Sequence, residues 1–282
     1  GVLKTVDGTP AQLAALETEL RSLAKSMPAT HEEIAAVAEA AGQLGVQREN
    51  VAAFTKTMIQ LGETTNLSAD LAATSLAQFM NIMGTSQSQV GRLGAALVAL
   101  GNDGASTEAD IMSMSMRIAA AGKQVGMSEA DVMGFANALA SVGVEAEVGG
   151  TAISMSFKQI DSAVRQGGAS LDLIAKTSGK TSAEFVKAWK TDAASATADF
   201  VGGLGKMQSK GEDVNKVLDD LGMTGIRQSD SLLRLASATA EAGNSQDLLR
   251  ESLKLGAEAY AENTALTDEY AKRAETAASQ AK

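Results

Sequence analysis

The chain has 282 residues, which is enough for one large domain or two small ones with a substantial core. It has no cysteine and one histidine, His31, which excludes disulfides, thiolate metal sites and the usual multi-histidine zinc site. The formal net charge is −10 and the sequence contains no cluster of Lys and Arg, which argues against specific binding of nucleic acid.

The composition favours helices. Aromatic residues make up only 3% of the chain, so the core must be built from Ala, Leu, Val, Ile and Met. The two prolines, Pro10 and Pro28, both lie near the start, which leaves the rest of the chain free to be helical. Strand-like alternation is nearly absent. We therefore predict an all-α fold of about a dozen short helices, each of roughly 10 to 18 residues, joined by glycine turns.

In chain order, residues 1–28 read as a loose lead-in and a first helix, and residues 29–243 as a compact helical array. Residues 244–282 are predicted to form one long helix, because Gly256 is the single glycine after Ser245 and no proline follows. The chain starts without Met and ends at Lys282 inside a helical pattern, so we expect a fragment of a longer protein.

Helix starts within the array carry capping signals. Thr30 precedes Glu33, Thr107 precedes Asp110, and Ser128 precedes Asp131 by three residues, which is the spacing of a capping box or its acidic variant. Apolar residues then recur three and four positions apart, as in a helix with one buried face. Such rows are Ile34, Val37, Ala38 and Ala41; Leu93, Leu97 and Leu100; and Val214, Val217, Leu218 and Leu221.

Helix ends carry a glycine followed by an apolar residue. Gly126, Gly143 and Gly222 are examples, and each is expected to adopt positive φ. The apolar residue can then fold back onto the last turn, and a following Ser, Thr or Glu opens the next helix.

No membrane span is predicted, because the apolar stretches, such as Ala95–Leu100, fall far short of about 18 residues. The N-terminal residues do not read as a signal peptide.

The last segment carries two apolar rows that are out of phase with each other. We expect residues 245–282 to associate with other copies through an imperfect seam. The rows are Leu249, Leu253 and Tyr260, then Leu266, Tyr270, Ala274 and Ala277.

Several residues suggest chemistry, but a structural role is the stronger interpretation of each. His31 is expected to be a solvated first-turn residue and not a general base. Gly202–Gly205 is expected to mark a helix break or close helix packing and not a phosphate loop, since no strand precedes it. Gly101–Gly104 lacks the acidic ligands of a calcium loop and is read as a turn.

The methionines Met112, Met114 and Met116 point in different directions around a helix, so core packing by one or two of them is expected. Trp189 is expected to be a core residue beside Phe185, although a partner interface remains open. We predict no catalytic, cofactor-binding or metal-binding residue, and no enzyme.

A set of short motifs, in this order and spacing, resembles the core region of phage tail tape measure proteins. The most specific block consists of Leu100–Thr107, Arg117–Gly122, Gly126–Glu129, Ala140–Gly143 and Gly149–Ala152. Further motifs are Glu39–Val46, Ser68–Leu71, Asn81–Gly84, Gly179, Phe185, Ala188–Lys190, Leu221–Gly222, Ile226–Arg227, Ser231–Ala236 and Glu262–Leu266.

This resemblance covers the chain from about His31 to its end. It implies a structural protein of the virion tail lumen that sets tail length, supports tail assembly and takes part in genome delivery. It also implies partners, namely tail tube and tail tip proteins and assembly chaperones, and a period in the host cytoplasm during assembly. Two alternatives stay open: a cell-wall-cleaving enzyme or effector carried in the tail, and an all-α interaction scaffold of a bacterial cell.

Overall fold

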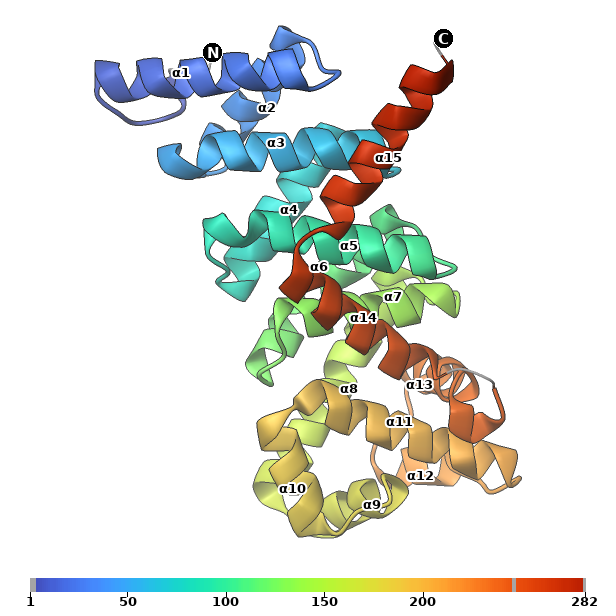
Figure 1. Cartoon of the computed structure of the whole chain (residues 1–282). Coiled ribbons are helices and arrows are strands. Elements are labelled where there is room, and N and C mark those ends of the chain that lie inside the picture. The colour runs from blue at the N-terminus through green and yellow to red at the C-terminus, as the bar shows by residue number, and fades with distance from the viewer. Residues whose placement is uncertain (1–3, 245–246, 281–282) are drawn as a thin grey trace. The chain divides into compact units, whose positions relative to one another are not determined.

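A computed structural model describes residues 4–244 and 247–280, and it is all-α over these residues, which confirms the predicted fold class (Figure 1). Helix lengths range from 7 residues in α12 to 21 in α8, a wider spread than the sequence suggested. The elements are α1 (Pro10–Ser26), α2 (His31–Gln43), α3 (Arg48–Thr64), α4 (Ala69–Met83), η2 (Gln87–Gln89), α5 (Val90–Asp103), α6 (Glu108–Gln124), α7 (Glu129–Ser141), α8 (Ala146–Gln166), α9 (Ala169–Thr177), α10 (Ser182–Thr191), α11 (Ala193–Ser209), α12 (Val214–Asp220), α13 (Ile226–Ser237), η3 (Ala240–Ala242), α14 (Leu248–Glu262) and α15 (Ala265–Gln280).

The predicted capping signals at Thr30 and Ser128 form real boxes. The hydroxyl of Thr30 accepts a hydrogen bond from the Glu33 N–H, and the Glu33 carboxylate accepts one from the Thr30 N–H at 2.7 Å. Ser128 and Asp131 make the same exchange. Each box satisfies two backbone donors that the first turn of a helix leaves without partners.

The glycine turns after α6, α7 and α12 share one geometry. Gly126, Gly143 and Gly222 have φ values of 86°, 74° and 71°. The apolar residue after each glycine donates its N–H to a carbonyl five residues back, as in a Schellman motif. These three apolar residues, Met127, Val144 and Met223, are buried, so each turn also contributes to the core.

The prediction of a single long C-terminal helix was wrong. The segment forms two helices, α14 and α15, that are separated at Asn263 and Thr264. Asn263 has φ of 58°, a left-handed conformation that Asn tolerates better than most residues. The break falls between the two apolar rows that the sequence shows to be out of phase, and it lets each row turn toward its own neighbours.

Contacts divide the chain into two units, which are described separately. Unit 1 runs to Asn102 and also takes in Thr107–Ala109 and the residues from Glu258 onward. Unit 2 consists of Asp103–Ser106 and Asp110–Ala257. This division does not coincide with the boundaries expected after residues 28 and 243. That those boundaries separate independently folding domains stays a prediction.

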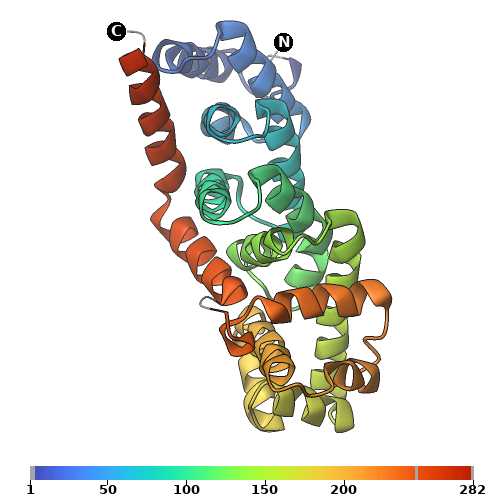
Figure 2. The same ribbon diagram turned by 90° about the vertical axis from the view of Figure 1, so that its right-hand side faces the viewer.

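In unit 1, α3 is the central helix and packs against α1, α2, α4 and α15. Phe54 of α3 and Phe79 of α4 are fully buried. Figure 2 shows α3 and α5 nearly end-on, with α15 lying along the side that they form. The guanidinium of Arg92 donates to the carbonyl oxygens of Tyr260 and Ala261 and so satisfies the last turn of α14.

In unit 2, α7 is buried on all sides. Every residue of α7 from Ala130 to Leu139 except Asp131 is buried, a pattern typical of a helix enclosed in a core. Phe135 contacts Phe157 of α8 edge to face, with ring centroids 5.3 Å apart. A second centre is α11, which packs against α9, α10, α12 and α13.

Candidate functional site: polar clusters and exposed surfaces

The residues that suggested chemistry occupy structural positions. His31 is exposed in the first turn of α2 and borders a small apolar hollow between α1 and α2. Trp189 is buried and stacks on Phe185, with ring centroids 6.2 Å apart. Its indole N–H donates to the carboxylate of Asp161 at 3.3 Å. The prediction that Trp189 is a core residue is confirmed.

Met112 and Met114 are buried and Met116 is half-buried, so two of the three belong to the core as expected. Gly202–Gly205 lies inside the uninterrupted helix α11 and not at a helix break. A Cβ atom at Gly203 would collide with the carbonyl of Thr177, so close packing against α9 is the role of this motif.

The Gly101–Gly104 motif spans the end of α5, which terminates at Asp103. Gly104 lies in the turn that follows, where a Cβ would come within 2.6 Å of the side-chain oxygen of Asn137. The turn interpretation therefore holds for Gly104 alone, because Gly101, Asn102 and Asp103 are helical.

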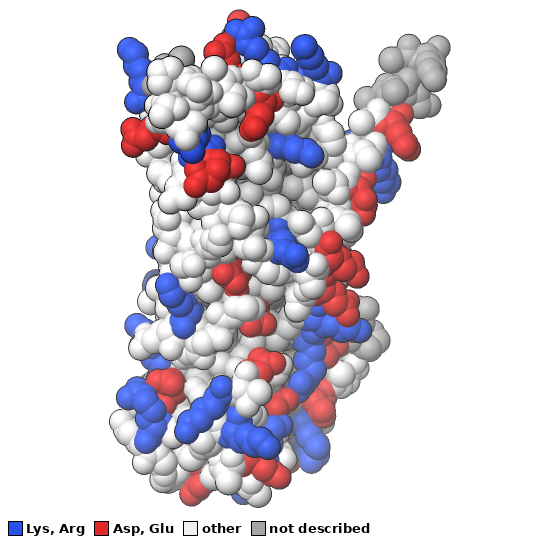
Figure 3. Space-filling model, turned by 60° about the vertical axis from the view of Figure 1, so that its left-hand side comes forward, with Lys and Arg blue, Asp and Glu red and all other residues white. Residues whose placement is uncertain are grey.

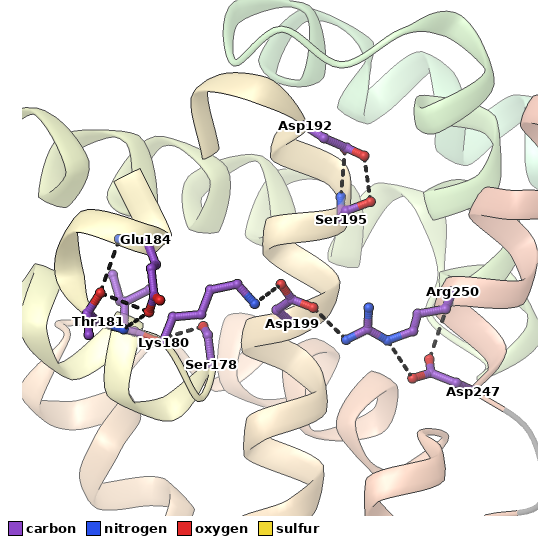
Figure 4. Close-up of polar contacts among 10 residues, drawn as sticks. Ser178, Lys180, Thr181, Glu184, Asp192, Ser195, Asp199, Asp247 and Arg250 are labelled. Carbon is purple, nitrogen blue, oxygen red and sulfur yellow. Dashed lines mark hydrogen bonds and ion pairs between the residues drawn. The ribbon is translucent and has the colours of Figure 1, made fainter. Parts of the chain in front are cut away.

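Four charged side chains of unit 2 form a connected ion-pair cluster on α11, α14 and the flanking turns (Figure 4). One carboxylate oxygen of Asp199 lies 2.5 Å from the Lys180 Nζ, and the other lies 2.7 Å from the Arg250 Nη2. Arg250 also contacts Asp247 at 3.1 Å. Asp199 thus ties the turn before α10 and the start of α14 to the middle of α11.

Arg250 and Glu184 have shifted pKa values. Burial alone lowers the pKa of Arg250, but the hydrogen bond to Asp199 and the charges of Asp199 and Asp247 outweigh it and raise the pKa. The pKa of Glu184 is lowered, first because the backbone N–H of Thr181 donates to it and second because the Thr181 hydroxyl does the same. Both groups therefore hold their charged forms more firmly, which suits structural ion pairs and caps.

A second polar cluster of unit 2 is buried. Asn137 of α7 accepts a hydrogen bond from Ser106 at 2.6 Å and donates one to Ser252 of α14 at 2.9 Å. Gly134, one turn earlier, brings the backbone of Leu253 within 2.9 Å of where a Cβ would stand. The amide and the glycine together dock α14 on α7. A lone Asn in an alanine-rich helix carries no sequence signal for this role.

A third polar cluster joins α8 and α13. The side-chain amide of Gln228, which is buried, donates to Ser156 at 2.9 Å and to Gln159 at 2.5 Å. Gln159 in turn donates to the carbonyl of Gly222 at 2.9 Å. All of these partners are neutral, so the cluster fixes packing and register and offers no acid or base.

The three leucines of the C-terminal apolar rows face their own chain, whereas Ala274 is exposed. Leu249 and Leu253 are buried in unit 2, and Leu266 is buried in unit 1 near Gly94. Tyr270 is half-buried, and burial first and Glu63 second raise its pKa. The side chain of Ala277 lies outside the described residues. The three leucines are therefore not available to a second copy of the chain. Association of copies through this segment stays a prediction.

Among residues 4–244 and 247–280, no group of three or more His, Cys, Asp or Glu side chains is placed to hold a metal ion. No helix in this part of the chain is both long and apolar enough to cross a membrane. On the face drawn in Figure 3, Lys and Arg side chains lie among Asp and Glu side chains.

Comparison with known proteins places this architecture in a family. The model of a family described as phage-related minor tail protein matches residues 17–165, which is more than half of the chain. Neither the curated proteins nor the solved structures provide a match. The matched region takes in nearly all of α1 to α8 and contains the most specific motifs, from Leu100 to Ala152. The chain belongs to the phage-related minor tail protein family, and it is a component of a virion tail.

Proposed function

We propose that this chain is part of a tape measure protein, which sets the length of the tail and has no enzymatic activity. The observation that carries the proposal is the family match over residues 17–165, together with tape-measure-like motifs that continue to Leu266. The helical build supports it, because an α-helix rises by a constant amount of about 1.5 Å per residue. Helical polypeptide is therefore a natural unit of length.

The glycine turns suit such a role. A single helix of 282 residues would extend on the order of 420 Å, far more than a packed domain of the same size. To straighten, a turn such as Gly126 must leave positive φ and enter the helical region. Glycine makes that change at a cost of only about 1 kcal/mol, since it has no Cβ. The same residues that end the helices thus permit a continuous one.

The proposed setting is the lumen of the tail tube, with tube and tip proteins as neighbours and chaperones as partners in the host cytoplasm during assembly. Release from the tube ahead of the genome would give the chain its part in delivery. A net charge of −10 supports this role, because DNA would pass such a surface without binding tightly.

Tail length tests the proposal. Purified tails should contain the chain by mass spectrometry, and in-frame duplication of a stretch of the array should lengthen tails by about 1.5 Å per added residue. Electron microscopy measures the lengths, and synonymous recoding of the same stretch is the control. Unchanged length in tails that carry the duplicated polypeptide would refute the ruler.

The absence of enzymatic activity is tested separately with peptidoglycan. We expect no protein-dependent release of soluble fragments by the purified chain. Release that a point substitution in this chain abolishes would overturn the structural proposal in favour of a tail-carried hydrolase.

A further inference from the structure

The feature of interest is a hollow of about 320 Å³ in unit 2, between the end of α9, the last turns of α11 and α12. Three apolar side chains form its floor, and three lysines form its rim. We call it the lysine-rimmed cavity. The floor consists of Leu173, Met207 and Val217, and the rim of Lys176, Lys206 and Lys210.

The local sequence explains why the three lysines meet. Lys206 and Lys210 are four residues apart at the end of α11, so they share one face. Lys176 stands in the last turn of α9. Gly203 allows α9 to approach α11 closely, because any Cβ there would strike the Thr177 carbonyl. The close approach brings Lys176 to the same opening as the α11 lysines.

The rim lysines stand out because three of them without ion-pair partners among the described residues gather at one opening, whereas several other cations of unit 2 are paired. Lys180 contacts Asp199, Arg165 contacts Asp161, and Lys216 contacts Asp220. Lys176, Lys206 and Lys210 are all exposed, and none of them has an ion-pair partner within the described part of the chain. Glu212 also lines the cavity and makes no ion pair with them. With three lysines and one glutamate, the charged residues that line the cavity sum to +2, in a chain whose net charge is −10.

The floor distinguishes between possible occupants. Leu173 and Met207 line the cavity and are half-buried, so apolar surface remains open beside the exposed lysines. Duplex DNA would present phosphates to the lysines but nothing apolar to the floor. A polypeptide segment with carboxylates around one apolar side chain matches both parts. A volume of this size lies at the small end of ligand pockets and accepts one or two side chains.

We propose that the lysine-rimmed cavity docks an acidic segment of another tail polypeptide, which inserts an apolar side chain over Leu173 and Met207 and sets carboxylates against Lys176, Lys206 and Lys210. This proposal rests on the proposed function, since it supplies one of the contacts that a tail protein makes. Exposed ion pairs of this kind are screened by salt, so the contact weakens as ionic strength rises.

Zero-length crosslinking of purified tails tests the proposal. A carbodiimide joins a lysine amine to a carboxylate only when the two are in direct contact. We expect crosslinks, identified by mass spectrometry, from the rim lysines to Asp or Glu of a different tail polypeptide. Lys158, Lys187 and Lys190 serve as matched controls, because they are exposed lysines of unit 2 outside the cavity and have no ion-pair partner in the described residues. They should give few or no such crosslinks.

A charge reversal provides the second arm. Lys176→Glu, Lys206→Glu and Lys210→Glu together should reduce the crosslinked partner in tails at least tenfold, whereas the same reversal at the three control lysines should leave it unchanged. Circular dichroism establishes that both variants fold, and a Lys→Gln version of the rim should give an intermediate loss.

Several outcomes overturn the inference. Equal crosslinking of rim and control lysines, crosslinks confined to Glu212, or crosslinks only to a second copy of this chain would each do so. So would binding of duplex DNA in a gel-shift assay that the rim reversal abolishes. Absence of the chain from purified tails would instead defeat the proposed function, whereas presence of the chain with unreacted rim lysines would defeat this inference alone.

Discussion

Gly134 is the residue at which packing is tightest between α7 and α14. A methyl group there would stand 2.9 Å from the Leu253 Cα and the Ser252 carbonyl oxygen, both of them backbone atoms that cannot rotate away. We expect Gly134→Ala to destabilise the protein by about 1–3 kcal/mol. Gly202 is the control, since its nearest atoms would be 3.7 Å away, and Gly202→Ala should stabilise by about 0.5–1 kcal/mol. Thermal melts that rank the two variants in the opposite order would refute the docking of α14 on α7.

Glu184 makes the stability of α10 depend on pH. Its folded pKa is lowered, so its contribution is complete above the ordinary carboxyl value of 4.5 and is lost as pH falls through the lower folded value. The protein should therefore melt at a higher temperature than Glu184→Gln at pH 7, and the difference should shrink as pH falls below 4.5. A difference that stays constant down to pH 3 would show that the ionised form of Glu184 makes no contribution to stability.

The sequence predicts residues whose partners are close along the chain and misses those whose partners are distant. Thr30 and Glu33 are three residues apart, and Trp189 and Phe185 are four apart, so local patterns sufficed for them. Asn137 meets Ser252 across 115 positions, and Asp199 meets Arg250 across 51. Local patterns contain no information about such pairs, because it is the packing of whole helices that brings them together.

At the scale of elements, the glycine turns determine where helices end. Gly126, Gly143 and Gly222 have positive φ, and apart from its chain neighbours no residue would come within 4 Å of a Cβ at Gly126. Ala at these positions should cost about 1 kcal/mol through backbone strain alone. Asn tolerates the left-handed conformation better, so Gly→Asn should cost less than Gly→Ala at each position. If urea titrations of all three Ala variants match the parent, these turns do not constrain the helices.

Asn263, between α14 and α15, ends a helix in the left-handed conformation as the turn glycines do, but with a side chain. Because its φ is 58°, Asn263→Gly should preserve or slightly raise stability, whereas Asn263→Val should lower it by about 1–2 kcal/mol. Hydrogen exchange should locate the loss in α14 and α15. Equal stability of the two variants would mean that the break does not require a left-handed residue.

The long C-terminal helix shows why element boundaries are hard to read. The segment has few glycines and no proline, so nothing in its composition announces a break. The sequence did contain one signal of the break. The apolar rows that begin at Leu249 and Leu266 are out of phase, so a continuous helix cannot bury both on one face.

The helix starts of α1 and α10 also carry signals in the sequence. Thr9 is followed three residues later by Gln, and Thr181 by Glu, and both pairs form capping boxes.

At the scale of the whole molecule, the fold class follows from the pattern of the chain, but the division into units does not. Helical periodicity and the scarcity of proline are properties of every segment, so all-α could be predicted. The membership of residues from Glu258 onward in unit 1 depends on contacts such as Arg92 with Ala261, which only the folded chain creates.

The placement of the aromatic residues has a consequence for how the two units can be observed. The only tryptophan, Trp189, lies in unit 2, and both tyrosines, Tyr260 and Tyr270, lie in unit 1. Light at the red edge of aromatic absorption excites tryptophan alone, so its emission follows the loosening of unit 2 next to Phe185. Tyrosine absorbance follows unit 1. The native chain thus carries a separate optical reporter in each unit, and superposition of the two melting curves would establish that the units unfold in a single cooperative step.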